Sequence, residues 1–188
     1  SVSTFGMLTT EVNDDSVPFI SSAQLYLETG EVVIVSSETL DRTRTSTADF
    51  TFMNTLVSPG PGDFISLAGG IIRETAEGGN MTVVLSEAQR VSLIRVSGQS
   101  GGDGEPVVLQ TVVGGITDLS GNPSVTGGVV PVQEFADESN PRMESVSIDY
   151  NDGMLTFTTS ETSRAGSLNL TRLFLINSTE WADASDVH

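Results

Sequence analysis

The chain has no cysteine and no lysine among its 188 residues, and its one histidine is His188 at the C-terminal end. The absence of cysteine excludes disulfide bridges, thiolate catalysis and cysteine-bound zinc or iron-sulfur clusters. A Ser-His-Asp arrangement would depend on that terminal histidine, and no lysine nucleophile exists. Most of the acidic residues fall in expected turns and linkers, where no buried carboxylate pair is evident. We therefore expect no enzymatic activity.

Positive charge is also scarce. The chain has eight basic residues, all arginine, and 25 acidic residues, which gives a formal net charge of −17. Such a surface repels phosphate backbones and anionic lipids, because their binding requires a basic patch. No apolar run approaches the roughly twenty residues that cross a bilayer. Neither nucleic acid nor membrane is therefore an expected partner, and cations are the natural counterpart.

The sequence repeats when it is shifted by 123 residues, which is the signature of tandem modules. On this basis we expect residues 1–13 to be the last strand of a preceding repeat, 14–136 a complete repeat and 137–188 the first half of the next. Two interpretations stay open: an excerpt of a longer array, or a self-assembling subunit that completes its neighbour by strand donation. The anchor pairs are Pro18 with Pro141, Gly30 with Gly153 and Glu38 with Glu161.

Short runs of Val, Ile, Thr, Phe and Leu between turn residues predict an all-β antiparallel sandwich. Gly30 and Gly153 are expected to close equivalent hairpins. One segment, residues 86–96, has helical spacing, and Ser86 with Gln89 has the form of a capping box. We expect strands near residues 19–27, 31–37, 48–54, 63–74, 80–85, 106–113 and 128–133.

Two kinds of site are predicted from local sequence. Asn80, Asn169 and Asn177 each begin an Asn-x-Ser/Thr triplet, the acceptor for N-linked glycans. The linkers bring hard oxygen ligands to the module junctions, so Asp14, Asp15, Asp137 and Glu138 are candidate ligands for a junction calcium ion. The alternative is a solvated acidic hinge. No other cofactor is expected.

The most distinctive string is Ile-Thr-Asp-Leu-Ser-Gly-Asn-Pro at residues 116–123. Asp118 can cap this turn, Gly121 supplies a positive φ, and Asn122 and Pro123 end the motif. The string resembles the Val-x-Asp-x-Ala-Gly-Asn-Pro closing motif of tandem bacterial Ig-like repeat domains, with Ser120 in the usual place of Ala. Similar units are found in large secreted proteins of marine algae and protists. The resemblance implies Ig-like sandwich repeats in cell-surface, adhesive or wall-associated arrays.

The leading hypothesis is a non-enzymatic structural segment of an extracellular array at the cell surface, in a wall or matrix, or in a filament. Its partners would be neighbouring copies of the repeat, other surface or matrix proteins, or further copies in a homo-polymer. One alternative is an adhesin or carbohydrate-binding module that uses an end loop or the glycine-rich residues 98–104. Another is a strand-exchanging filament subunit, in which residues 1–13 would be needed for polymerisation.

Overall fold

A computed structural model describes residues 11–54, 60, 62–74, 76–163 and 169–174. The chain divides into two compact units, Ser1–Ser139 and Asn140–His188. The described residues are mainly β-strands with one α-helix, as the sequence predicts. None of the helices among them is long and apolar enough to cross a membrane.

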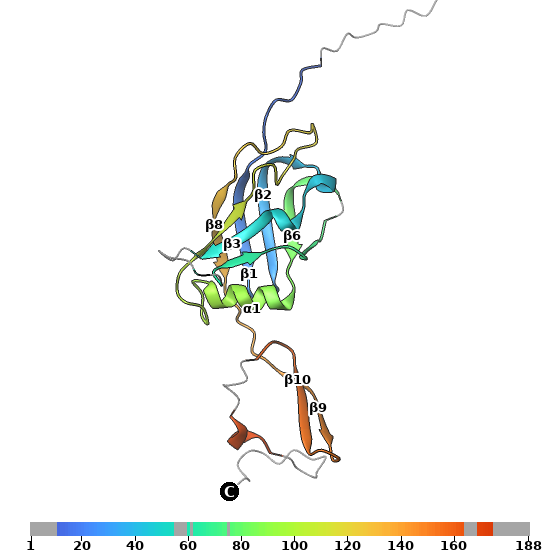
Figure 1. Ribbon diagram of the computed structural model, residues 1–188, viewed down its shortest axis with the longest axis vertical. Coiled ribbons are helices and arrows are strands. Elements are labelled where there is room, and N and C mark those ends of the chain that lie inside the picture. The colour runs from blue at the N-terminus through green and yellow to red at the C-terminus, as the bar shows by residue number, and fades with distance from the viewer. Residues whose placement is uncertain (1–10, 55–59, 61, 75, 164–168, 175–188) are drawn as a thin grey trace, which may run out of the picture. The chain divides into compact units, whose positions relative to one another are not determined.

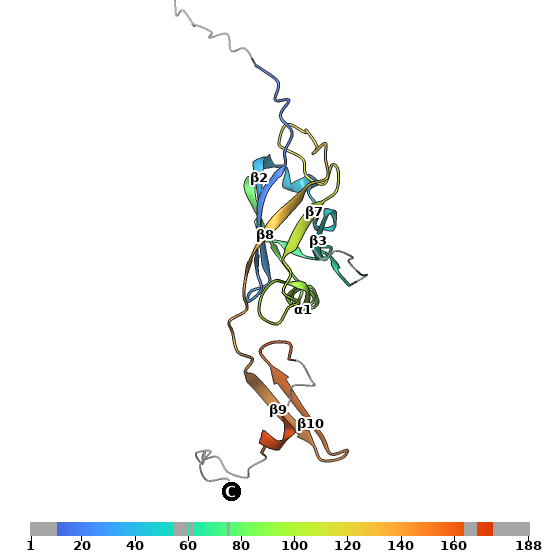
Figure 2. The same cartoon turned by 90° about the vertical axis from the view of Figure 1, so that its left-hand side faces the viewer.

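The first unit is one curled eight-stranded sheet in the order β4-β3-β7-β8-β1-β2-β6-β5. Its two ends fold toward each other, so that β1 and β2 lie in one layer and β3 and β7 in the other, with β8 contributing to both (Figure 2). The central strands are β1 (Ile20–Tyr26), β2 (Glu31–Leu40), β3 (Phe50–Asn54), β6 (Gly78–Val84), β7 (Val107–Thr111) and β8 (Val129–Phe135).

One strand pair departs from the predicted antiparallel pattern. β8 lies beside β1 in parallel, with Ala23 opposite Val132 and Tyr26 opposite Phe135. A parallel pair needs a long connection between its strands, and here the rest of the unit forms it. The sheet is therefore mixed, and the expectation of a wholly antiparallel sandwich is wrong at this pair.

The prediction of a single strand near residues 63–74 is also wrong. It is two short edge strands, β4 (Phe64–Ser66) paired with β3 and β5 (Ile71–Ile72) paired with β6. A turn separates them: Gly69 has φ +86°, and the amide of Gly70 donates to the Leu67 carbonyl at 2.9 Å. The glycine pair thus lets the chain pass from one end of the sheet to the other.

The predicted helix is α1 (Glu87–Val96), which crosses one end of the two layers (Figure 1). Its capping box is formed as expected. The Gln89 amide donates to Ser86 Oγ at 3.3 Å, and the Ser86 amide donates to Gln89 Oε1 at 2.9 Å. These bonds satisfy backbone donors that the first turn leaves free.

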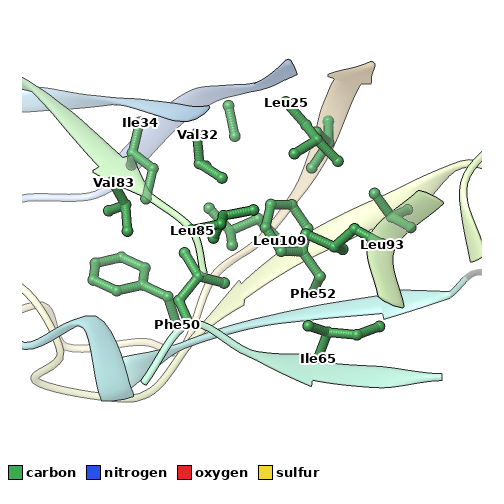
Figure 3. Packing of buried hydrophobic residues seen from close by; sticks show 14 of the residues in the cluster. Leu25, Val32, Ile34, Phe50, Phe52, Ile65, Val83, Leu85, Leu93 and Leu109 are labelled. Carbon is green, nitrogen blue, oxygen red and sulfur yellow. The ribbon is translucent and has the colours of Figure 1, made fainter. Parts of the chain in front are cut away.

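The core of the first unit lies between the two layers and under α1 (Figure 3). Phe50 and Phe52 from β3 and Leu25 from β1 are fully buried. Burying a large aliphatic or aromatic side chain contributes about 1.5–3 kcal/mol. Two 3₁₀ turns, η1 (Arg42–Arg44) and η2 (Thr47–Asp49), connect β2 to β3.

The second unit contains one described hairpin, β9 (Met143–Asp149) with β10 (Met154–Thr159), and the turn η4 (Leu170–Arg172). Its register repeats that of β1 and β2 residue for residue at the shift of 123, including an extra residue near the start of the first strand. Gly30 and Gly153 have φ values of +68° and +74°. Three residue pairs of the first hairpin have equivalents in the second. Leu25–Val32 corresponds to Ile148–Leu155, Ala23–Ile34 to Val146–Phe157, and Ile20–Ser36 to Met143–Thr159.

Candidate functional site

The linker before β1 contacts the corner that contains the Asp-x-x-Gly-Asn-Pro motif. Ser120 Oγ donates to Asp14 Oδ2 at 3.1 Å, and Asn122 Nδ2 donates to the Asp14 carbonyl at 2.9 Å. The Ser16 amide donates to Asp14 Oδ1 at 3.1 Å. Asp14 is therefore fixed to this corner of the first unit.

The corner itself is held by Asp118, which is 2 % exposed. The Asn122 amide donates to Asp118 Oδ1 at 2.7 Å, and Asn122 Nδ2 donates to Asp118 Oδ2 at 2.9 Å. Gly121 has φ +92°, a backbone conformation that residues with a side chain rarely adopt. Pro123 forms a bridge with Thr117 where the corner closes.

Three acidic side chains meet at this end of the first unit. Carboxylate oxygens of Asp14, Glu38 and Asp118 lie within 4.8 Å of one another. Burial, followed by repulsion from Asp14 and Asp118, raises the pKa of Glu38. Burial also acts to raise the pKa of Asp118, but hydrogen bonds from Asn122 and the backbone amides of the corner together lower it. The ionised form of Glu38 is therefore disfavoured in the folded protein.

A cation would relieve this repulsion, but the cluster supplies only part of a calcium site. Calcium takes six to eight oxygen ligands, and three carboxylates fall short of that number. Of the residues predicted as ligands, Asp14 belongs to the cluster, while Asp15, Asp137 and Glu138 are outside it. Junction calcium therefore stays a prediction.

The linker after β8 binds a different group, the guanidinium of Arg90 on α1. Arg90 Nη1 donates to Asp137 Oδ2 at 2.8 Å and to the Leu27 carbonyl at 3.0 Å. Its Nε and Nη2 donate to the two carboxylate oxygens of Glu87 at 2.8 and 3.0 Å. The Arg90 side chain is 8 % exposed and that of Asp137 16 %. These bonds raise the pKa of Arg90, so its charge is permanent.

The next residues of the same linker are fixed as well. The Ser139 amide donates to Asp137 Oδ1 at 3.1 Å, and Ser139 Oγ donates to Glu28 Oε1 at 2.6 Å. Glu28 lies in the turn between β1 and β2, next to the Leu27 carbonyl that Arg90 contacts. Residues 137–139 are therefore fixed to the rest of the first unit.

Asp14 and Asp137 occupy equivalent positions at the shift of 123, and their local structure is the same. In each, Oδ1 accepts the amide of the residue two positions on, at 3.1 Å. In each, Oδ2 accepts a hydrogen bond from a side chain, that of Ser120 for Asp14 and that of Arg90 for Asp137. Sequence reasoning identified both aspartates but missed Arg90 and Glu38. Glu38 carried a signal, since it is one of the repeat's anchor positions.

The remaining predicted residues lie apart from the linkers. Asn80 is exposed on β6, and Asn169 is exposed before η4, where its Oδ1 accepts the Thr171 amide at 3.1 Å. Asn177 and His188 lie outside the described residues. The glycine-rich loop folds back on the end of α1, where the Gly104 amide donates to the Ser97 carbonyl at 3.3 Å. Glycosylation at the three asparagines stays a prediction.

Neither a family model nor a curated protein matches the chain. Among solved structures it is similar to the N-terminal part of the bacterial S-layer protein SbsC, with a TM-score of 0.41 and 11 % identity over 72 % of this chain and 27 % of that one. A structure of domains 1–6 of surface layer protein SbsC gives a TM-score of 0.42 and 11 % identity over 73 % and 16 %. The chain thus spans about a quarter or less of these proteins, and the likeness is confined to coarse fold.

Proposed function

We propose that this chain is a non-enzymatic structural segment of a tandem Ig-like array on the outside of a cell. The observation that carries the proposal is the repeated local structure: hairpin register, turn glycine and linker hydrogen bonds recur at the same shift of 123 residues. A match at so many hydrogen-bonded positions supports a repeated module. The acidic, cysteine-free composition suits a module whose stability rests on a buried aliphatic core.

The two linkers support a mechanical role for the repeat. Asp137 is held by the module before it, through Arg90, and Asp14 by the module after it, through Ser120 and Asn122. If the two are equivalent, each linker aspartate of an array is held from both sides. The bonds are compatible, since a carboxylate oxygen has two lone pairs and can accept from an arginine and a serine together. Such a linker would fix the spacing and direction of successive modules.

The repeat itself is tested by an internally duplicated chain, in which residues 1–136 are followed directly by residues 14–188. An independent module should fold again in the inserted copy. The calorimetric enthalpy of unfolding should then rise by about 0.7 kcal/mol for each added residue near 60 °C. A matched control inserts the same residues in scrambled order. An unchanged enthalpy, with the inserted residues exchanging amide hydrogens as fast as the scrambled control, would contradict the repeat.

Location is tested on the cells that produce the protein. Antibodies against the chain should label intact cells, and the label should be removed by a protease added outside. Labelling that requires permeabilised cells would contradict an extracellular array. The same material analysed by mass spectrometry would show whether Asn80, Asn169 and Asn177 carry glycans.

A further inference from the structure

The first and last described strands of the first unit, β1 and β8, are direct neighbours that run in parallel. Ala23 lies opposite Val132, and Tyr26 lies opposite Phe135. The start of β1 is therefore beside the start of β8, and the two ends lie together as well. Because the chain enters the unit before β1 and leaves it after β8, its entry and exit are at opposite ends of one strand pair (Figure 2).

The contacts of the two linkers mark this entry and exit. Asp14, before β1, is bound by Ser120 in the corner that bridges to the end of β2, beside the start of β1. Asp137, after β8, is bound by Arg90, which also donates to the Leu27 carbonyl just beyond the end of β1. A pull on the two linkers would therefore draw β1 and β8 lengthwise in opposite directions.

The direction of a load decides how the hydrogen bonds between two strands break. When neighbouring strands are drawn lengthwise past each other, the bonds between them share the load and must break together. When the strands are separated from the same end, each bond carries the load in turn and they break one at a time. Since the rate of unfolding governs forced unfolding, the lengthwise direction gives the greater resistance.

The pair is joined by further contacts besides its backbone ladder. The Leu27 amide donates to the Phe135 carbonyl at 3.0 Å, which extends the pairing past the end of β1. The rings of Tyr26 and Phe135 stack with centroids 4.5 Å apart and planes 4° from parallel. Gln24 Nε2 donates to Gln133 Oε1 at 3.4 Å. Each strand is also paired on its other side, β1 with β2 and β8 with β7, so sliding would strain the whole sheet.

We propose that β1 and β8 form a mechanical clamp, a strand pair loaded lengthwise that lets the first unit resist stretching between its two linkers. The inference rests on the proposed array, in which neighbouring modules transmit tension through the linkers. The contacts of Asp14 and Asp137 lie outside the strand pair and involve few bonds, so they would yield first. The clamp would then set the force at which the unit opens, and the module would keep its length below that force.

The clamp is tested on the full chain by single-molecule pulling between two introduced cysteines, since the natural chain has none. One variant carries Asp15→Cys and Asn140→Cys, which load the pair lengthwise. The matched control carries Asp15→Cys and Thr126→Cys, which load the starts of both strands and separate them bond by bond. All three positions are exposed. The first variant should unfold at a several-fold higher force at equal pulling speed, and equal forces would overturn the clamp.

Two substitutions in the variant that is pulled lengthwise distinguish the clamp from general stability. Tyr26→Ala removes the ring stack between β1 and β8 and should lower the unfolding force. Val83→Ala leaves a cavity at a fully buried position of β6, away from the pair. It should lower the melting temperature at least as much as Tyr26→Ala but reduce the force less. A larger loss of force for Val83→Ala would overturn the clamp.

Failure of the clamp and failure of the array are distinguishable. The duplicated chain described above tests the array by its unfolding enthalpy without any load. Equal forces in the two pulling directions would leave that enthalpy unchanged and the array intact. An array contradicted by the duplicated chain would leave the measured difference in force as a property of the first unit, with no neighbouring module to load it.

Discussion

The two hairpins of this protein have the same backbone and opposite surroundings. β1–β2 and β9–β10 share register, turn glycine and extra residue, yet the first is the centre of a core and the second is exposed on the same face. The backbone pattern is therefore set by local sequence, which is similar at the shift of 123 residues. Burial is added by strands and a helix that are distant in the chain. The comparison predicts where equivalent substitutions should have unequal effects.

The largest difference is expected for truncation of equivalent aliphatic side chains. Leu25→Ala should lower the free energy of unfolding of the first unit by about 2–5 kcal/mol, because it leaves a cavity in a fully buried site. Ile148→Ala, at the equivalent exposed position, should change stability by less than about 0.5 kcal/mol. Urea unfolding followed by circular dichroism measures both. Similar losses for the two variants would contradict the difference in burial between the hairpins.

The next largest difference is expected between the two linker aspartates. Substitution of Asp137 should lower the stability of the first unit, whereas substitution of Asp14 should not. Asp137→Asn weakens a charge-assisted bond to buried Arg90 and should cost the first unit about 1.5–3 kcal/mol. Asp14→Asn removes a charge beside Glu38 and Asp118 while its amide oxygen can still accept from Ser16, so stability should be unchanged or higher.

Thermal unfolding of the two single variants, beside Arg90→Met and the double variant Arg90→Met/Asp137→Asn, separates these effects. The double variant should lose less than the sum of its singles, because the two side chains contact each other. Additive losses would mean that the Arg90–Asp137 pair carries no coupling, and the linker would then not be fixed by it.

The turn glycines should differ by a smaller amount. An L-residue in the left-handed region costs roughly 1–2 kcal/mol, so Gly30→Ala and Gly153→Ala share that loss. Gly30→Ala adds a contact of 3.3 Å between the new Cβ and Arg90 Cδ, whereas Gly153 has no neighbour within 4 Å. Asparagine tolerates positive φ, so Gly153→Asn should recover most of the hairpin while Gly30→Asn should not. Amide hydrogen exchange of each hairpin measures this, and equal recovery at both sites would contradict the contact with Arg90.

Sequence patterns predicted the parts of this structure that short segments determine. The turn glycines, the alternation along β1 and the Ser86–Gln89 capping box are all local, and the structure contains each of them. The parallel pairing of β1 with β8 and the Arg90–Asp137 bond join residues far apart in the chain, and no local signal distinguishes Arg90 from the other arginines. The break between β4 and β5 was marked by Gly69 and Gly70, but their effect depends on close packing against Val83.

The smallest expected effect is a pH-dependent gain in stability from Glu38→Gln. This gain tests the acidic cluster of Asp14, Glu38 and Asp118 directly. Burial and the neighbouring aspartates raise the pKa of Glu38 in the folded state above its usual 4.5. Well below that value the side chain is neutral in both states and contributes no repulsion. As the pH rises through 4.5 the unfolded chain ionises first, so the folded state loses stability, and the loss is complete above the folded pKa.

Glu38→Gln removes this loss, so its melting temperature should exceed that of the natural chain at pH 7 and equal it well below pH 4.5. The control is Glu161→Gln, the equivalent position of the second unit, which lies outside the cluster of Asp14, Glu38 and Asp118. Millimolar calcium should reduce the gain if the ion binds the same carboxylates, since it would neutralise their repulsion in the natural chain. A variant less stable than the natural chain at pH 7 would mean that the hydrogen bond between Ser16 and Glu38 outweighs the repulsion.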